Sequence, residues 1–192
     1  MAQYFCRVCE NTNGWVSPTN SARETTSSHH GKFSFGYEEW NFSPHLLIAG
    51  WQYGWIEGFR SGPGRRDVAP SYHEVILYVR RNGQSLAVGK IRACEKLAST
   101  VAAPAYPAAL AREANGVGAM ITVVGSNWSV SPTVVNPGMA AYVQTPLPNC
   151  RFKPSDAYLF AVPITIPIPY TRYGALLVTP TNRRAAIWGL VP

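Results

Sequence analysis

The stretch FSFGYEEWNFSPHLLIAGWQYGWIEGF, from Phe33 to Phe59, contains nine aromatic side chains in 27 residues, whereas aromatic residues make up 12% of the whole chain. Within this stretch Trp51, Tyr53 and Trp55 occupy alternate positions. A β-strand points successive side chains to opposite faces, so all three rings would share one face. Such a row can belong to a hydrophobic core or line a pocket for a flat ligand. The aromatic excess is larger than one small core needs, which favours a ligand for some of these rings.

Composition indicates a basic, turn-rich domain. The chain has 192 residues, with 17 Lys and Arg against 10 Asp and Glu, which gives a formal net charge of +7. This length suits one domain, which we expect to span residues 1–189. The basic balance favours a polyanionic partner, most commonly nucleic acid, with a merely basic soluble protein as the alternative. Sixteen glycines and sixteen prolines indicate short strands and many turns rather than long helices.

The ends of the chain carry two further expectations. Leu190–Pro192 matches the opening of a common thrombin-cleavage tag, so we expect the natural residues to end near Gly189. The N-terminus does not read as a signal segment, and the chain has no apolar run of about 18 residues. These features predict a cytoplasmic location and no membrane partner.

The cysteines are expected to be buried thiols. Cys6 and Cys9 form a single C-x-x-C, and the other two cysteines are Cys94 and Cys150. A structural zinc site usually takes its ligands from two such pairs. Residues three apart on a strand also face opposite sides. A metal site and a redox pair are the less favoured alternatives, and no metal or cofactor is expected.

The most specific local signal is a β-hairpin. Asn82-Gly83 separates two apolar runs, Glu74–Arg81 and Ser85–Ala93, and Asn-Gly in this setting is typical of a two-residue hairpin turn. Prolines between Asp156 and Pro180 confine strands there to sheet edges. Further strands are expected at Gln3–Cys9, Gly50–Phe59, Ala119–Val124, Ala140–Gln144 and Arg151–Lys153. A helical turn is expected at Glu38–Trp40. A helix is expected at Pro107–Asn115, because Pro stands at its first position and Gly directly after its last one.

Enzyme motifs are missing from the sequence. It contains no G-x-S-x-G, H-E-x-x-H, P-loop or G-x-G-x-x-G pattern. Glu38–Glu39 is the only adjacent carboxylate pair, and its two side chains would diverge on a helical turn. We therefore expect a binding module without catalytic residues, and a small-molecule or nucleotide enzyme is the less favoured hypothesis.

Several segments carry a resemblance. The order of a first strand, a Trp-bearing loop, an aromatic strand and a hairpin ending in VGKIR resembles the PUA-like superfamily, which includes EVE, YTH and ASCH domains. FGYEEWNF, YGWIEGF and VILYVRRNGQSLAVGKIRACEKL resemble the N-terminal EVE-like modules of bacterial modification-dependent restriction proteins, in which an HNH nuclease domain usually follows. NCRFKPSDAYLF resembles the closing strand of such modules. The resemblance covers most of the chain through short motifs.

The resemblance implies an α+β fold, a PUA-like bent β-barrel of five or six mainly antiparallel strands with few short helices. It also implies that the module flips a modified base of double-stranded DNA, most simply 5-methylcytosine or a derivative, into a pocket during bacterial defence. Flipping costs a few kcal/mol, and stacking on rings returns about 1–3 kcal/mol per base. This chain has no HNH segment, so nuclease activity would lie in a fused downstream domain. An RNA-binding PUA-like module is the alternative.

The resemblance places the pocket between the end of the first strand, the following loop and the aromatic segment. The candidate rings are Trp15, Trp40, Trp51 and Tyr53. The polar candidates for the base edge are Asn11, Ser17 and Glu39, for which a cap or turn role is the alternative. The candidate phosphate contacts are Arg60, Arg65, Arg66, Arg80, Arg81, Arg183 and Arg184, for which simple solvation is the alternative. A homodimer on a palindromic target is compatible with the sequence but not required by it.

Overall fold

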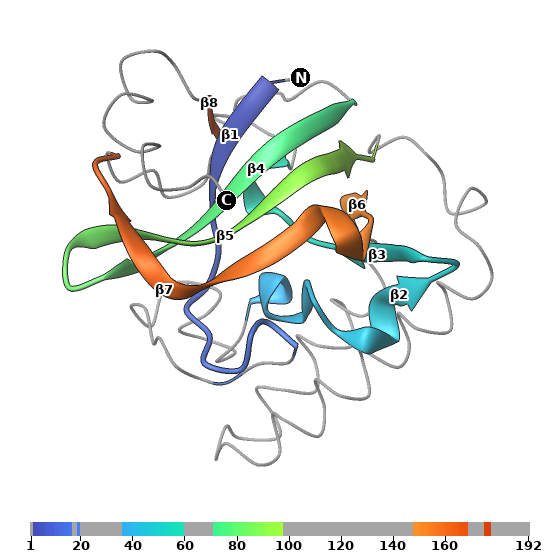
Figure 1. Cartoon of the computed structure of the whole chain (residues 1–192), viewed down its shortest axis with the longest axis horizontal. Coiled ribbons are helices and arrows are strands. Elements are labelled where there is room, and N and C mark those ends of the chain that lie inside the picture. Colours follow the sequence, from blue (N-terminus) through green and yellow to red (C-terminus); the bar gives the residue numbers. More distant parts are fainter. Residues whose placement is uncertain are drawn as a thin grey trace, which may run out of the picture.

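A computed structural model of the chain describes residues 2–16, 19, 36–59, 71–97, 148–168 and 175–177 (Figure 1). These residues form strands and short 3-10 helices, which confirms a β-rich fold. The strands are β1 (Ala2–Arg7), β2 (Leu47–Ile48), β3 (Trp51–Gly54), β4 (Tyr72–Arg81), β5 (Gln84–Lys96), β6 (Cys150–Phe152), β7 (Ala157–Ile166) and β8 (Ala175–Leu177). The 3-10 helices are η1 (Tyr37–Trp40), η2 (Pro44–Leu46), η3 (Glu57–Phe59) and η5 (Pro154–Asp156). The helix predicted at Pro107–Asn115 and the strands predicted at Ala119–Val124 and Ala140–Gln144 lie outside the described residues.

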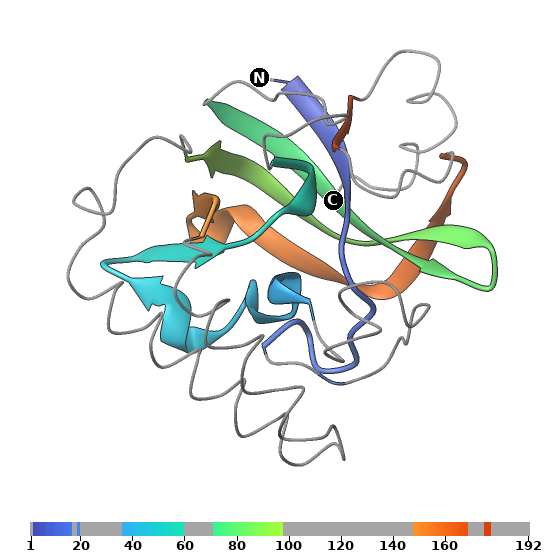
Figure 2. The ribbon, with the colours of Figure 1, turned by 180° about the vertical axis from the view of Figure 1, so that it is seen from behind.

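The described strands form one mixed sheet in the order β2-β3-β6-β5-β4-β1-β8, with β7 paired to β5. β5 is its central strand, because β4 pairs along one edge while β7 and then β6 pair along the other. Within the described part of the chain, β1 and β4 are parallel and all other pairs are antiparallel, as predicted. This part contains eight strands, more than the five or six expected, and the sheet they form is open. Seen from behind, β2 and β3 form a small hairpin at the side of the sheet beside β6 (Figure 2).

The predicted hairpin is confirmed as β4 and β5. Its turn residues Asn82 and Gly83 have φ angles of 49° and 78°. A type I′ turn needs positive φ at both central positions, which Asn tolerates and Gly adopts freely. The predicted helical turn at Glu38–Trp40 is also present, as η1. None of the helices in the described ranges has the length and apolarity needed to cross a membrane.

The prediction of a strand over Gly50–Phe59 is wrong for its second half, because β3 ends at Gly54. The side-chain amide of Asn41 accepts from Trp55 N at 2.7 Å and donates to Trp55 O at 2.9 Å. Asn149 makes the same two bonds to Ile56, each of 2.9 Å. These two side-chain amides take the place of hydrogen bonds from a neighbouring strand. The backbone N–H and C=O groups of Trp55 and Ile56 are therefore bonded although the chain leaves the sheet there and enters η3. The third ring of the predicted row therefore does not sit on the same strand as the first two.

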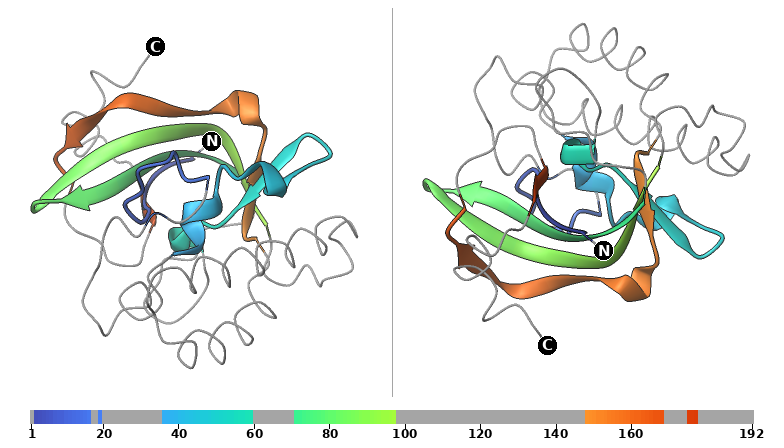
Figure 3. Two further views of the ribbon diagram at one scale, coloured as in Figure 1. Left: turned by 90° about the horizontal axis from the view of Figure 1, so that it is seen from below. Right: turned by 90° about the horizontal axis from the view of Figure 1, so that it is seen from above.

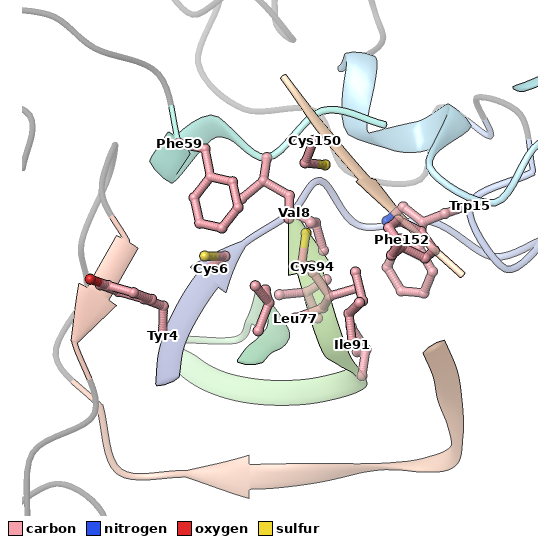
Figure 4. Close-up of a cluster of buried hydrophobic side chains, with 14 residues drawn as sticks. Tyr4, Cys6, Val8, Trp15, Phe59, Leu77, Ile91, Cys94, Cys150 and Phe152 are labelled. Carbon is pink, nitrogen blue, oxygen red and sulfur yellow. The ribbon is translucent and has the colours of Figure 1, made fainter. Parts of the chain in front are cut away.

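The larger apolar cluster lies on one face of the sheet, called here the core face. The side chains that meet on it come from β1, β4, β5 and β6 and from the Trp15 loop and η3 (Figure 4). The buried cluster on this face includes Tyr4, Cys6, Val8, Trp15, Ile56, Phe59, Val75, Leu77, Val88, Ile91, Cys94 and Phe152. Strands β4, β5 and β7 are curved, and the short helices η1 and η3 lie on their concave side (Figure 3). The opposite face carries a second apolar cluster around Phe5, Ile76 and Tyr78, towards the far end of β7.

The prediction of buried thiols is confirmed for three cysteines and is wrong for Cys9, which is half-buried. Cys6, Cys94 and Cys150 lie in the core. Cys9 lies beyond the end of β1, and its Sγ is 3.7 Å from Oε2 of Glu38. Within the described ranges, no three His, Cys, Asp or Glu side chains are grouped in a way that could hold a metal ion.

Candidate nucleic-acid interface

Trp51 lies beside two cations on the face opposite the core. Its neighbour Gln52 pairs with Phe152, whose ring belongs to the core. Since adjacent strand residues point to opposite sides, Trp51 and Arg151 share the other face. The Arg151 guanidinium carbon lies 4.6 Å from the centre of the Trp51 ring, and Nζ of Lys153 lies 4.0 Å from it. Both distances are within the range of cation–π attraction.

The Arg151 side chain is held by a row of residues across four strands. In the sheet register, Tyr72 of β4 opposes Glu95, Glu95 opposes Arg151, and Arg151 opposes Tyr53 of β3. Arg151 Nε donates to Glu95 Oε2 at 2.5 Å, and Tyr72 Oη donates to the same oxygen at 3.2 Å. The hydrogen bond with Glu95 raises the pKa of the Arg151 guanidinium above its usual value, and Tyr53 adds to this effect. Arg151 is therefore a fixed, permanently charged donor beside Trp51.

Lys153 contributes a second charge to this site. It follows β6 and precedes Pro154, and its backbone is extended, at φ −78° and ψ 138°, as expected for a residue before proline. Among the described residues, no carboxylate pairs with its ammonium, and its contact there is the Trp51 ring. The half-buried Trp51 ring and the Lys153 ammonium make a site that suits an aromatic anion such as a nucleotide.

Three of the predicted base-pocket residues form a separate hydrogen-bond network beyond β1. Asn11 Nδ2 donates to Glu39 Oε2 at 3.1 Å, and its Oδ1 accepts from the backbone of Asn13 at 2.9 Å and of Trp15 at 2.8 Å. The fully buried Glu39 carboxylate also accepts from the backbone N–H groups of Gly36 and Thr19. Asn11 thus shows the turn role that was the alternative to base recognition.

The Trp15 ring lies in the core, and its Nε1 donates to Cys9 O at 2.9 Å. Trp15 shares the core face with Phe152, whereas Trp51 lies on the other side of the sheet. The structure therefore brings Asn11, Trp15 and Glu39 together, and separately brings Trp51 and Tyr53 together beside Arg151. It does not join the two groups in one pocket. Ser17 and the side chain of Trp40 lie outside the described part.

The predicted phosphate contacts that the structure describes lie at the hairpin turn. Arg81 forms an ion pair with Glu10, and Arg80 donates to Ser85 Oγ at 3.0 Å. The other five lie outside the described residues: Arg60, Arg65, Arg66, Arg183 and Arg184.

Arg151 and Lys153 were missed as site residues. The available signal was their alternate spacing in CRFK, within a predicted short strand, which places both cations on one face. Their proximity to Trp51 depends on the pairing of β3 with β6, which joins segments about a hundred residues apart.

Comparison of the chain with family models, with curated proteins and with solved structures finds no match.

Proposed function

We propose that the chain is a DNA-binding module of PUA-like type that recognises a modified base in a duplex. The observation that carries the proposal is the Trp51 ring with Arg151 and Lys153 within 5 Å of its centre. A ring can stack on an unpaired base for about 1–3 kcal/mol, and neighbouring cations neutralise the phosphates on either side. The net charge of +7 supports the same partner.

In this proposal the target base, 5-methylcytosine or a derivative, leaves the helix and stacks on aromatic side chains including Trp51. Extrusion costs a few kcal/mol, which stacking can offset. One buried methyl group adds only about 0.8 kcal/mol, so discrimination also needs a pocket that fits the modified base better than the plain one. The module would direct a modification-dependent restriction system whose nuclease lies in another domain.

The test is a titration of matched duplexes carrying cytosine, 5-methylcytosine, 5-hydroxymethylcytosine or N6-methyladenine at one position, at fixed salt. We expect tighter binding to one modified duplex than to its unmodified counterpart. Equal affinity for all four duplexes would contradict modified-base recognition. Tighter binding to structured or single-stranded RNA than to any duplex would favour the RNA-binding alternative.

A further inference from the structure

A second ring–cation pair lies on the same face as Trp51. Arg92 of β5 is exposed, and its guanidinium carbon lies 5.5 Å from the centre of the Tyr158 ring of β7. Tyr158 opposes Lys90 in the register, and Lys90 and Arg92 flank the core residue Ile91. Lys90, Arg92 and Tyr158 are therefore on the opposite face.

A β-bulge keeps the two pairs on one face. Ile91 opposes Val75 and Cys94 opposes His73, so β5 has one extra residue between these positions. Because both Ile91 and Cys94 point to the core, Arg92 and Glu95 both point away from it. Glu95 opposes Arg151 of β6, which lies beside Trp51. Lys90, Arg92 and Glu95 therefore follow one another along one face of β5 and lead to the Trp51 site. Three residues of strand span about 10 Å, a distance that covers two or more successive phosphates.

Two of the four cations on this face form ion pairs with described carboxylates and two do not. Lys90 Nζ lies 2.9 Å from Glu74, and Arg151 is bonded to Glu95. Among the described residues, Arg92 and Lys153 have no carboxylate partner, and each lies beside an aromatic ring. We call Tyr158, Arg92, Arg151, Lys153 and Trp51 the cationic strip; each end has a ring and a cation that pairs with none of the described carboxylates.

The geometry points to a binding track for a single nucleic-acid strand along the cationic strip, with one base on Tyr158, another on Trp51 and the phosphates on Arg92 and Lys153. The inference rests on the proposed function and adds the form of the ligand. Bases inside a duplex are already stacked on both sides, so two rings on an open sheet face suit unstacked bases. A strand locally separated from its complement, as base extrusion requires, presents such bases.

The experiment compares the binding of a fluorescent oligothymidylate by the whole chain and by four variants, the fourth being Tyr158→Phe, which keeps the ring. Arg92→Gln removes the cation beside Tyr158, which pairs with no carboxylate in the described part of the chain. Tyr158→Leu removes the ring but keeps apolar bulk against Phe160, whose ring lies 5.8 Å away. Lys90→Gln is the matched control, because it removes the same charge from the same strand and face, at a cation already paired with Glu74. Thermal melting verifies that each variant is folded.

We expect Tyr158→Leu to weaken binding about fivefold or more, because it removes one stacked base. Arg92→Gln should reduce the slope of log affinity against log salt by about 0.7, the value for one phosphate of a single strand. Lys90→Gln should have the smallest effect, and Tyr158→Phe should bind like the unchanged chain. Binding of Arg92→Gln and Tyr158→Leu no weaker than that of Lys90→Gln would overturn the track, as would failure of the unchanged chain to bind the oligonucleotide. Either result leaves the proposed function to be decided by the matched duplexes.

Discussion

At the scale of single residues, two tryptophans that look equivalent in the sequence have different surroundings. Trp15 is 6% exposed and lies in the core, whereas Trp51 is half-buried beside two cations. Burial of a ring contributes to the free energy of unfolding, and an accessible ring is available to a ligand. The difference arises from location in the fold and not from residue type.

Substitution by alanine should separate these two roles. Trp51→Ala is expected to weaken DNA binding by about 1–3 kcal/mol with little change in the free energy of unfolding. Trp15→Ala should cost about 3–5 kcal/mol of stability, because it leaves a cavity and an unpaired Cys9 carbonyl. Urea unfolding and fluorescence anisotropy measure the two quantities. A large stability loss for Trp51→Ala with unchanged affinity of the folded protein would assign this ring to the core instead.

The buried thiols should make stability fall in alkaline solution. Burial raises the pKa of the Cys6 thiol, and burial with a hydrogen bond involving Cys150 raises that of Cys94. In the unfolded chain both ionise near pH 8.5, whereas the folded state keeps them protonated. The unfolded state therefore binds fewer protons above that pH, and stability is lost as pH rises.

The expected slope is up to about 1.4 kcal/mol per pH unit for each thiol, measured by urea unfolding between pH 7 and pH 10. Cys94→Ala should have a shallower slope than the unchanged chain. A stability that stays constant over this range would contradict the burial of these thiols.

At the scale of elements, two asparagine side chains decide where β3 ends. Asn41 and Asn149 bind the N–H and C=O groups of Trp55 and Ile56. Asn149 lies 93 residues from Ile56 in the sequence. Alternating rings predict a strand through this point because the pattern is local, whereas the groups that interrupt it are distant. The Asn82-Gly83 hairpin was predictable because its turn and both strands are adjacent in the chain.

Loss of the Asn149 side-chain amide should destabilise the segment in which the chain leaves β3 and enters η3. Asn149→Ala leaves a donor and an acceptor of Ile56 without their partner, at about 1–3 kcal/mol for each buried group. Asn149→Asp keeps an acceptor for the Ile56 N–H and should lose less. Urea unfolding measures both variants. Equal stability of Asn149→Ala and the unchanged chain would show that water replaces these bonds without cost.

At the scale of the whole molecule, apolar side chains are buried on both faces of the sheet, and one face also carries a row of cations and rings. The core face carries the larger apolar cluster, while the opposite face carries both the smaller cluster around Tyr78 and the cationic strip, whose role in binding is our proposal. The sequence predicts a β-rich chain, mainly antiparallel strands and an excess of rings. It does not predict the face on which each ring lies, because that depends on the pairing of β3 with β6 and on the bulge in β5. Trp15 and Trp51 were therefore expected in one pocket but lie on opposite sides.

The measurement that tests nucleic-acid binding at Trp51 most directly is the salt dependence of duplex affinity for Lys153→Gln and Arg81→Gln. Each substitution removes one positive charge. Lys153→Gln removes it beside Trp51, and Arg81→Gln removes it at the distant hairpin turn, where Arg81 pairs with Glu10. We expect Lys153→Gln to weaken binding to every sequence and to reduce the slope of log affinity against log salt by about 0.9, the value for one phosphate contact. Arg81→Gln should change neither quantity to a comparable extent. Unchanged affinity and slope for Lys153→Gln would contradict the assignment of this face to nucleic acid.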